Sequence, residues 1–136
     1  MAEVSNAAEP TVLIVDDEEP IRQLERRILE SGGYQVLEAA RAVDAFALLQ
    51  GHPIRVDLLI ADLLMPDIGG EEMARRIRRD RPEIKVLYVT GHIDELMDER
   101  STLWEGEAFL DKPFSAKALL EAVSLLLYKR LPPNPK

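Results

Sequence analysis

The sequence contains no cysteine, and this absence excludes several kinds of chemistry. Without cysteine the chain cannot form disulfides, bind a metal through thiolates or use a thiolate nucleophile. No apolar run approaches the roughly 20 residues that a membrane-spanning helix needs. The first ten residues, MAEVSNAAEP, lack the basic segment and apolar core of a secretory signal. We therefore expect a cytoplasmic protein that makes no membrane contact.

Positive charge is also scarce. Lysine and arginine number 17 against 25 aspartates and glutamates, which gives a formal net charge of -8. Nucleic acid repels such a chain, so we predict no direct nucleic acid binding. The one basic run, residues 75–81, follows Glu71 and Glu72 at the spacing of helix ion pairs, and we interpret it as a solvated face.

Apolar segments and amphipathic segments alternate five times along the 136 residues. Continuous apolar runs predict strands buried on both faces, and apolar residues at helical spacing predict the intervening helices. Such alternation is typical of an α/β fold with one parallel sheet covered by helices on both sides. We expect a flexible leader (1–10), one domain (11–131) and a flexible tail (132–136). The expected strands are 11–15, 34–38, 56–61, 84–90 and 108–110, and the expected helices are 20–31, 41–50, 71–80, 93–103 and 116–127.

Polar side chains stand where the expected strands end. Asp16 and Asp17 follow the first strand, and Asp62 follows the third. Thr90 ends the fourth strand, and Lys112 comes shortly after the fifth. Functional sites of open parallel sheets lie beyond the carboxyl ends of the strands, so we expect these five residues to meet at one edge.

Three clustered carboxylates need a counter-charge, because otherwise they would repel one another or become protonated. A hard divalent cation with oxygen ligands and several waters, such as Mg²⁺, meets this need. A carboxylate beside Mg²⁺, with a lysine and a hydroxyl nearby, is suited to accept a phosphoryl group. The residues therefore predict a magnesium site next to an aspartate that becomes phosphorylated.

Other sites find little support. No glycine follows the first strand in VDDEEPIR, which disfavours a phosphate loop or a dinucleotide site. His52 and His92 lie far apart in expected loops and make no plausible ligand pair. Other acidic residues have ordinary explanations as solvated, structural or capping groups: Glu18 and Glu19 at a helix start, Asp57 and Asp111 beside strands, and Asp67 in the turn after Pro66.

Four motifs, VDDEEP, DLLMPDIGGEE, VTG and FLDKPF, resemble in this order those of the receiver domain of two-component response regulators. The resemblance covers residues 11 to about 131. It implies a flavodoxin-like (βα)5 fold, doubly wound, with strand order 2-1-3-4-5. It also implies a module that takes its phosphoryl group from a phosphohistidine on a sensor kinase or phosphotransfer protein. Beyond self-phosphorylation and slow self-dephosphorylation, we expect no enzyme activity.

The resemblance assigns the metal ligands. Asp62 is the phosphoacceptor and also a ligand. Of the acidic pair, Asp17 binds Mg²⁺ directly and Asp16 binds it mostly through water. The backbone carbonyl of Leu64 completes the protein's share of the metal shell. Because Leu64 is apolar and cannot orient an attacking water, we expect slow dephosphorylation.

The resemblance also implies a switch. Thr90 and Lys112 bind the phosphoryl oxygens, Thr90 moves inward, and Phe109 fills the space that it leaves. The peptide bond between Lys112 and Pro113 is cis in the family. The new conformation would bind a downstream protein through the expected fourth helix (93–103), fifth strand and last helix. Leu125 and Leu126 widen the apolar face of the last helix, which hints at a homodimer. For Trp104 we expect core packing, with the alternative that it marks the partner surface together with Tyr128 and Leu131.

Two alternatives remain at this point. The chain could be a receiver-like scaffold that works without phosphorylation, although the complete set of Asp17, Asp62, Thr90 and Lys112 opposes this. It could also be a Mg²⁺-dependent phosphohydrolase. That enzyme would need a second acid two residues after its nucleophile to protonate the leaving group, and Leu64 occupies this position.

Overall fold

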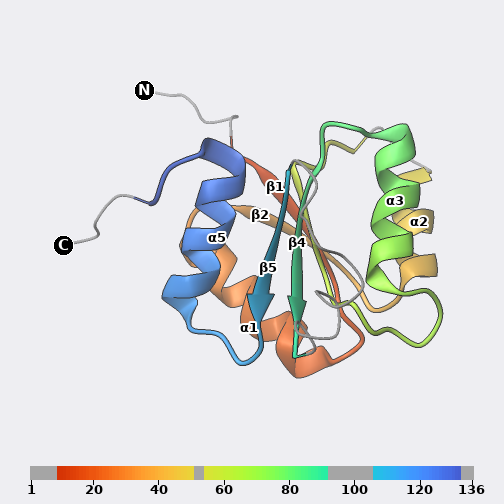
Figure 1. Ribbon diagram of the computed structural model, residues 1–136, viewed down its shortest axis with the longest axis horizontal. Coiled ribbons are helices and arrows are strands. Elements are labelled where there is room, and N and C mark those ends of the chain that lie inside the picture. Colours follow the sequence, from red (N-terminus) through yellow and green to blue (C-terminus); the bar gives the residue numbers. More distant parts are fainter. Residues whose placement is uncertain (1–8, 51–53, 92–105, 133–136) are drawn as a thin grey trace.

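The protein is described from a computed structural model, which covers residues 9–50, 54–91 and 106–132. Figure 1 shows one sheet between two layers of helices. The strands are β1 (Thr11–Val15), β2 (Gln35–Ala39), β3 (Leu58–Ala61), β4 (Lys85–Thr90) and β5 (Glu107–Asp111). The helices are α1 (Glu19–Ser31), α2 (Ala42–Gln50), α3 (Gly70–Asp80) and α5 (Ala116–Tyr128).

All five strands are parallel, in the order β2-β1-β3-β4-β5, which confirms the predicted fold. For the elements within the described residues, each boundary lies within two residues of its predicted position. The central strands are buried on both faces, as continuous apolar runs predict. In the register, Val15 pairs with Ala61 and Thr90 pairs with Asp111, so the carboxyl ends of the strands lie at one edge.

The core has two halves, one on each face of the sheet. Alternate β1 residues divide between them, since Leu13 faces α2 and α3 while Ile14 faces α1 and α5. Met73 and Ile77 fill the first half from α3. Leu119 and Val123 fill the second half from α5.

The helix ends follow local chemistry. Pro20 stands in the first turn of α1, where a missing N–H costs nothing. Ser115 caps α5 by accepting a hydrogen bond from the backbone N–H of Ala118 at 3.0 Å. Asp67 reaches beyond its own turn, because its carboxylate accepts backbone N–H bonds from Ala42 (3.4 Å) and Val43 (3.0 Å) at the start of α2.

The other structural residues agree with their predicted roles. Asp57 accepts a hydrogen bond from the backbone N–H of Thr11 at 2.8 Å and thereby ties the start of β3 to β1. In the basic run, Glu72 forms ion pairs with both Arg75 and Arg76. Two arginines of the run are therefore balanced on the solvated surface of α3.

Several predictions fall on residues outside the described ranges. These are the helix over 93–103, His52, His92, Trp104, and most of the leader and tail. Within the described ranges, no helix is both long and apolar enough to cross a membrane.

The spacing of apolar residues in the sequence predicts that Leu24 and Ala116 face inward, and both predictions are wrong. Leu24 is 42% exposed, whereas its neighbour Glu25 is 1% exposed. At 100° per residue, Glu25 lies within the arc of α1 that Ile28 and Leu29 define, and Leu24 lies at its rim. Ala116 is exposed because it stands in the first turn of α5.

Glu25 is an unusual core residue. Neither of its carboxylate oxygens has a hydrogen-bond partner in the described part of the chain. Burial, reinforced by the negative charge of Asp16, raises the pKa of Glu25 from 4.5 to about 8, although Lys112 acts in the opposite direction. The side chain is therefore mostly protonated at neutral pH in the folded protein.

We predict that Glu25 makes the folded state less stable as pH rises from about 4.5 to about 8. In that window the folded protein keeps a proton that the unfolded chain has released, so the free energy of unfolding decreases by at most about 1.4 kcal/mol per pH unit. In Glu25→Gln this pH-dependent loss should disappear. Glu25→Leu should also gain about 1–3 kcal/mol at pH 7, since no polar group is left unpaired. Urea unfolding across this pH range measures both effects.

Glu30→Gln is the matched control, because Glu30 is the same type of residue on the exposed side of the same helix. Parallel pH profiles for the wild type and Glu25→Gln would contradict the prediction.

Candidate functional site

The carboxyl ends of β1, β3 and β5 bring three predicted residues into contact. The ammonium Nζ of Lys112 lies 3.2 Å from Asp16 Oδ2 and 3.2 Å from Asp62 Oδ2. These side chains are 18%, 2% and 11% exposed, respectively. One ammonium thus bridges two largely buried carboxylates that are 46 residues apart in the sequence.

The backbone N–H, the carbonyl and both carboxylate oxygens of Asp16 all form hydrogen bonds. Its N–H donates to the carbonyl of Ala39 at 3.2 Å, and Oδ1 accepts from the N–H of Glu18 at 2.9 Å. Its carbonyl accepts from the Arg22 guanidinium at 2.8 Å. Burial nevertheless raises the pKa of Asp16, since the Glu18 N–H and Lys112 only partly offset the loss of hydration.

For Lys112 the surroundings favour the charged form. Burial alone would lower the pKa of this ammonium, but the charges of Asp16 and Asp62 outweigh it and raise the pKa above its ordinary value. Lys112 is therefore charged at physiological pH. Its backbone N–H donates to the carbonyl of Thr90 at 2.9 Å, and the peptide bond to Pro113 is cis.

A cation would fit beside this ammonium. One carboxylate oxygen each from Asp16, Asp17 and Asp62 can be chosen so that all three lie within 4.8 Å of one another. Asp17 is exposed, whereas the other two are buried. Three carboxylates face one lysine, so negative charge is in excess, and oxygen ligands of this kind suit Mg²⁺. Glu18 adds a further carboxylate 3.8 Å from Lys112 Nζ, on a side chain that is 61% exposed.

The loop after β3 closes tightly over Asp62. The N–H of Leu64 donates to Asp62 Oδ1 at 3.3 Å, and the N–H of Gly70 donates to the carbonyl of Leu63 at 2.9 Å. A Cβ at Gly70 would lie 2.2 Å from the backbone oxygen of Asp62. Only glycine therefore fits where α3 begins.

Of the remaining predicted residues, Thr90 lies on β4, Phe109 lies on β5 and Leu64 lies in the loop after β3. Thr90 is fully buried at the end of β4. Phe109, on β5, is partly buried and stacks on Tyr88 with the ring centroids 5.1 Å apart. Leu64 presents its side chain to solvent with 57% exposure.

Sequence reasoning missed three residues around the site: Arg22, Glu25 and Gly70. Glu25 could have been noticed, because it interrupts an apolar stripe four residues after Ile21 and three before Ile28. The role of Gly70 depends on a contact with Asp62, and that of Arg22 depends on a contact with Asp16. Neither contact has a local sequence signal.

Comparisons with known proteins agree with this geometry. The family model "Response regulator receiver domain" matches residues 12–124. The sensor kinase CckA of Brucella abortus is 35% identical over 88% of this chain. The response regulator receiver protein CpdR of the same organism is 28% identical over 85% of it. The crystal structure of a receiver domain from the hybrid histidine kinase CckA has a TM-score of 0.73, with 32% identity, and covers 86% of this chain and 98% of that domain.

The relatives differ in length. This chain spans 13% of the sensor kinase, about half of the transcriptional regulatory proteins PhoB and FixJ and 26% of DctD, but 95% of CpdR. The similarity therefore concerns one domain, which occurs both within longer proteins and as most of a short one.

We predict that Gly70→Ala destabilises the protein by about 3 kcal/mol, at the upper end of the usual cost of overpacking. The added methyl group would meet the Asp62 backbone, which cannot move without disturbing β3. Gly69→Ala is the matched control, since a Cβ there would be 3.3 Å from the Leu63 oxygen. It should cost less than about 1 kcal/mol. Equal urea midpoints for the two variants would show that the close approach is unimportant.

Proposed function

This chain belongs to the family of response regulator receiver domains, and from this premise we propose that it accepts a phosphoryl group on Asp62 in a two-component phosphorelay. The donor is a phosphohistidine on a sensor kinase or a phosphotransfer protein. A carboxylate oxygen of Asp62 attacks phosphorus, the P–N bond breaks, and the imidazole leaves with the electron pair and takes up a proton. The product is an aspartyl phosphate.

The observation that carries this proposal is the contact of Lys112 with both Asp16 and Asp62 at 3.2 Å. This contact supports the proposal because a positive charge lies beside Asp62, at the edge of the sheet where the three carboxylates meet. Phosphoryl transfer relies mainly on such positioning and charge stabilisation.

Each residue has a defined task. Held by Asp16, Asp17, Asp62 and the Leu64 carbonyl, Mg²⁺ would supply positive charge to the phosphoryl oxygens. Lys112 neutralises a second phosphoryl oxygen. The hydroxyl of Thr90 donates a hydrogen bond to a third.

The signal is transmitted through a movement of the Thr90 side chain. When its hydroxyl engages the phosphoryl group, Phe109 leaves its stack on Tyr88 and occupies the space vacated beside Thr90. The two arrangements bias the surface formed by β5, α5 and the helix expected over residues 93–103. On α5, Leu125 and Tyr128 are 48% and 46% exposed, and we assign them to the surface that binds a downstream protein or a second copy of the chain.

The phosphorylated state should be long-lived. The exposed side chain two residues after Asp62 belongs to Leu64, which has no group to orient a water for attack on phosphorus. Hydrolysis of the aspartyl phosphate therefore depends on other proteins more than on this site.

We predict that acetyl phosphate and Mg²⁺ add one phosphoryl group to the wild type. Asp62→Asn should add none, because an amide is not nucleophilic at phosphorus. Asp67→Asn should behave as the wild type, since it removes the same charge from the same loop while keeping an oxygen to cap α2. Intact-protein mass spectrometry with and without Mg²⁺ distinguishes these results.

A wild type that gains no mass under these conditions would contradict the proposal. It would instead favour a scaffold that works without phosphorylation, and partner binding would then be independent of Asp62.

A further inference from the structure

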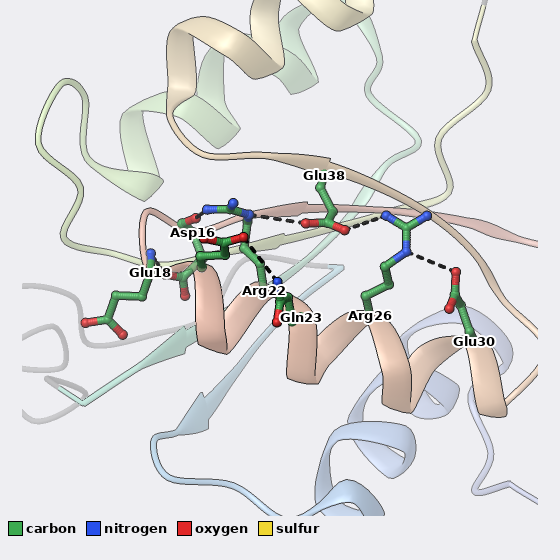
Figure 2. A network of polar contacts seen from close by, with 8 residues as sticks. Asp16, Glu18, Arg22, Gln23, Arg26, Glu30 and Glu38 are labelled. Carbon is green, nitrogen blue, oxygen red and sulfur yellow. Dashed lines mark hydrogen bonds and ion pairs between the residues drawn. The ribbon is translucent and has the colours of Figure 1, made fainter.

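One arginine connects the acidic site to the rest of the fold. The Arg22 guanidinium, on the first turns of α1, donates Nη1–H to the carbonyl of Asp16 at 2.8 Å and Nε–H to Glu38 Oε1 at 3.2 Å (Figure 2). Glu38 lies on β2, so Arg22 ties the turn after β1 to the neighbouring strand. Its side chain is only 16% exposed.

The carbonyl that Arg22 binds belongs to the peptide group between Asp16 and Asp17. This group is planar and includes the Asp17 N–H and Cα, so a hydrogen bond to its oxygen also restrains the position of the Cα that carries the Asp17 side chain. Asp17 is exposed, whereas Asp16 is buried and bound on all sides. The Arg22 guanidinium therefore restrains the backbone position of Asp17, the exposed member of the acidic pair.

The carboxylate that binds Arg22 is shared with a second arginine of α1. Glu38 also forms an ion pair with Arg26, one turn further along α1, and Arg26 in turn binds Glu30 at 3.0 Å (Figure 2). Hydrogen bonds from Arg26 and Arg22 lower the pKa of Glu38, so this carboxylate stays charged at neutral pH. Of the two arginines that share Glu38, Arg22 is the one bonded to the acidic turn.

We propose that Arg22 is a positioning residue, which sets the affinity of the Asp16–Asp17–Asp62 cluster for a divalent cation by fixing the peptide between Asp16 and Asp17. The inference rests on the proposed function, because it assumes that this cluster binds Mg²⁺. Arginine suits the task, since its planar fork can reach a carbonyl and a carboxylate at the same time. A lysine would have to reach both oxygens with one nitrogen, and it lacks the fixed spacing of the donors in a guanidinium.

The test compares two arginines on one helix. Isothermal titration with Mg²⁺ should show about tenfold weaker binding for Arg22→Gln than for the wild type, the effect typical of residues that orient metal ligands. Arg26→Gln removes the same charge and the other half of the Glu38 interaction, and its Mg²⁺ affinity should stay within twofold of the wild type. The Mg²⁺ affinity of Arg22→Lys should lie between those of Arg22→Gln and Arg26→Gln. Thermal unfolding without Mg²⁺ should show similar losses for Arg22→Gln and Arg26→Gln.

Each outcome decides the matter. Equal Mg²⁺ affinities for Arg22→Gln and the wild type would overturn the positioning role, as would equal losses in Arg22→Gln and Arg26→Gln, since a general loss of charge or stability would then suffice. If Arg22→Gln fails to fold, wild-type affinity in Arg22→Lys overturns the role and a several-fold loss supports it. A wild type that neither binds Mg²⁺ nor gains a phosphoryl group would overturn the proposed function as well.

Discussion

The contact of the Lys112 ammonium with Asp16 and Asp62 is the interaction on which the functional edge of the sheet depends. Two buried carboxylates so close together would repel each other. A single positive charge, 3.2 Å from both, makes the arrangement tolerable. It leaves an excess of negative charge once Asp17 is counted, and this excess is what a divalent cation would neutralise.

The loops around this contact are fixed by groups distant in sequence. Arg22 and Glu38 hold the turn after β1, and the absence of a side chain at Gly70 lets α3 begin directly against the Asp62 backbone. Asp67, in the same loop, caps α2. The residues of the site therefore sit on rigid neighbours, which fits a family whose chemistry depends on positioning more than on unusual reactive groups.

Glu25 shows how far the field of the site extends. It lies in the core beneath α1, yet its protonation depends on Asp16, Asp62 and Lys112 as well as on its own burial. A carboxyl group without a hydrogen-bond partner in the described part of the chain reduces stability, and the burial of apolar side chains elsewhere in the core offsets this cost. The charges at the acidic edge therefore affect the protonation of a carboxyl group in the core.

The sequence by itself determined the α/β class, the parallel sheet and the strand ends that carry the site. Continuous apolar runs and helical spacing are local signals, and in a parallel sheet all strand ends fall on one edge. Only the tertiary structure decided which side chains touch. It placed Glu25 inward and Leu24 outward, set Lys112 between two carboxylates, and brought Arg22 to the Asp16 carbonyl. These contacts join segments that are remote in the chain or depend on the rotation of a helix about its axis, and neither property is written in a local pattern.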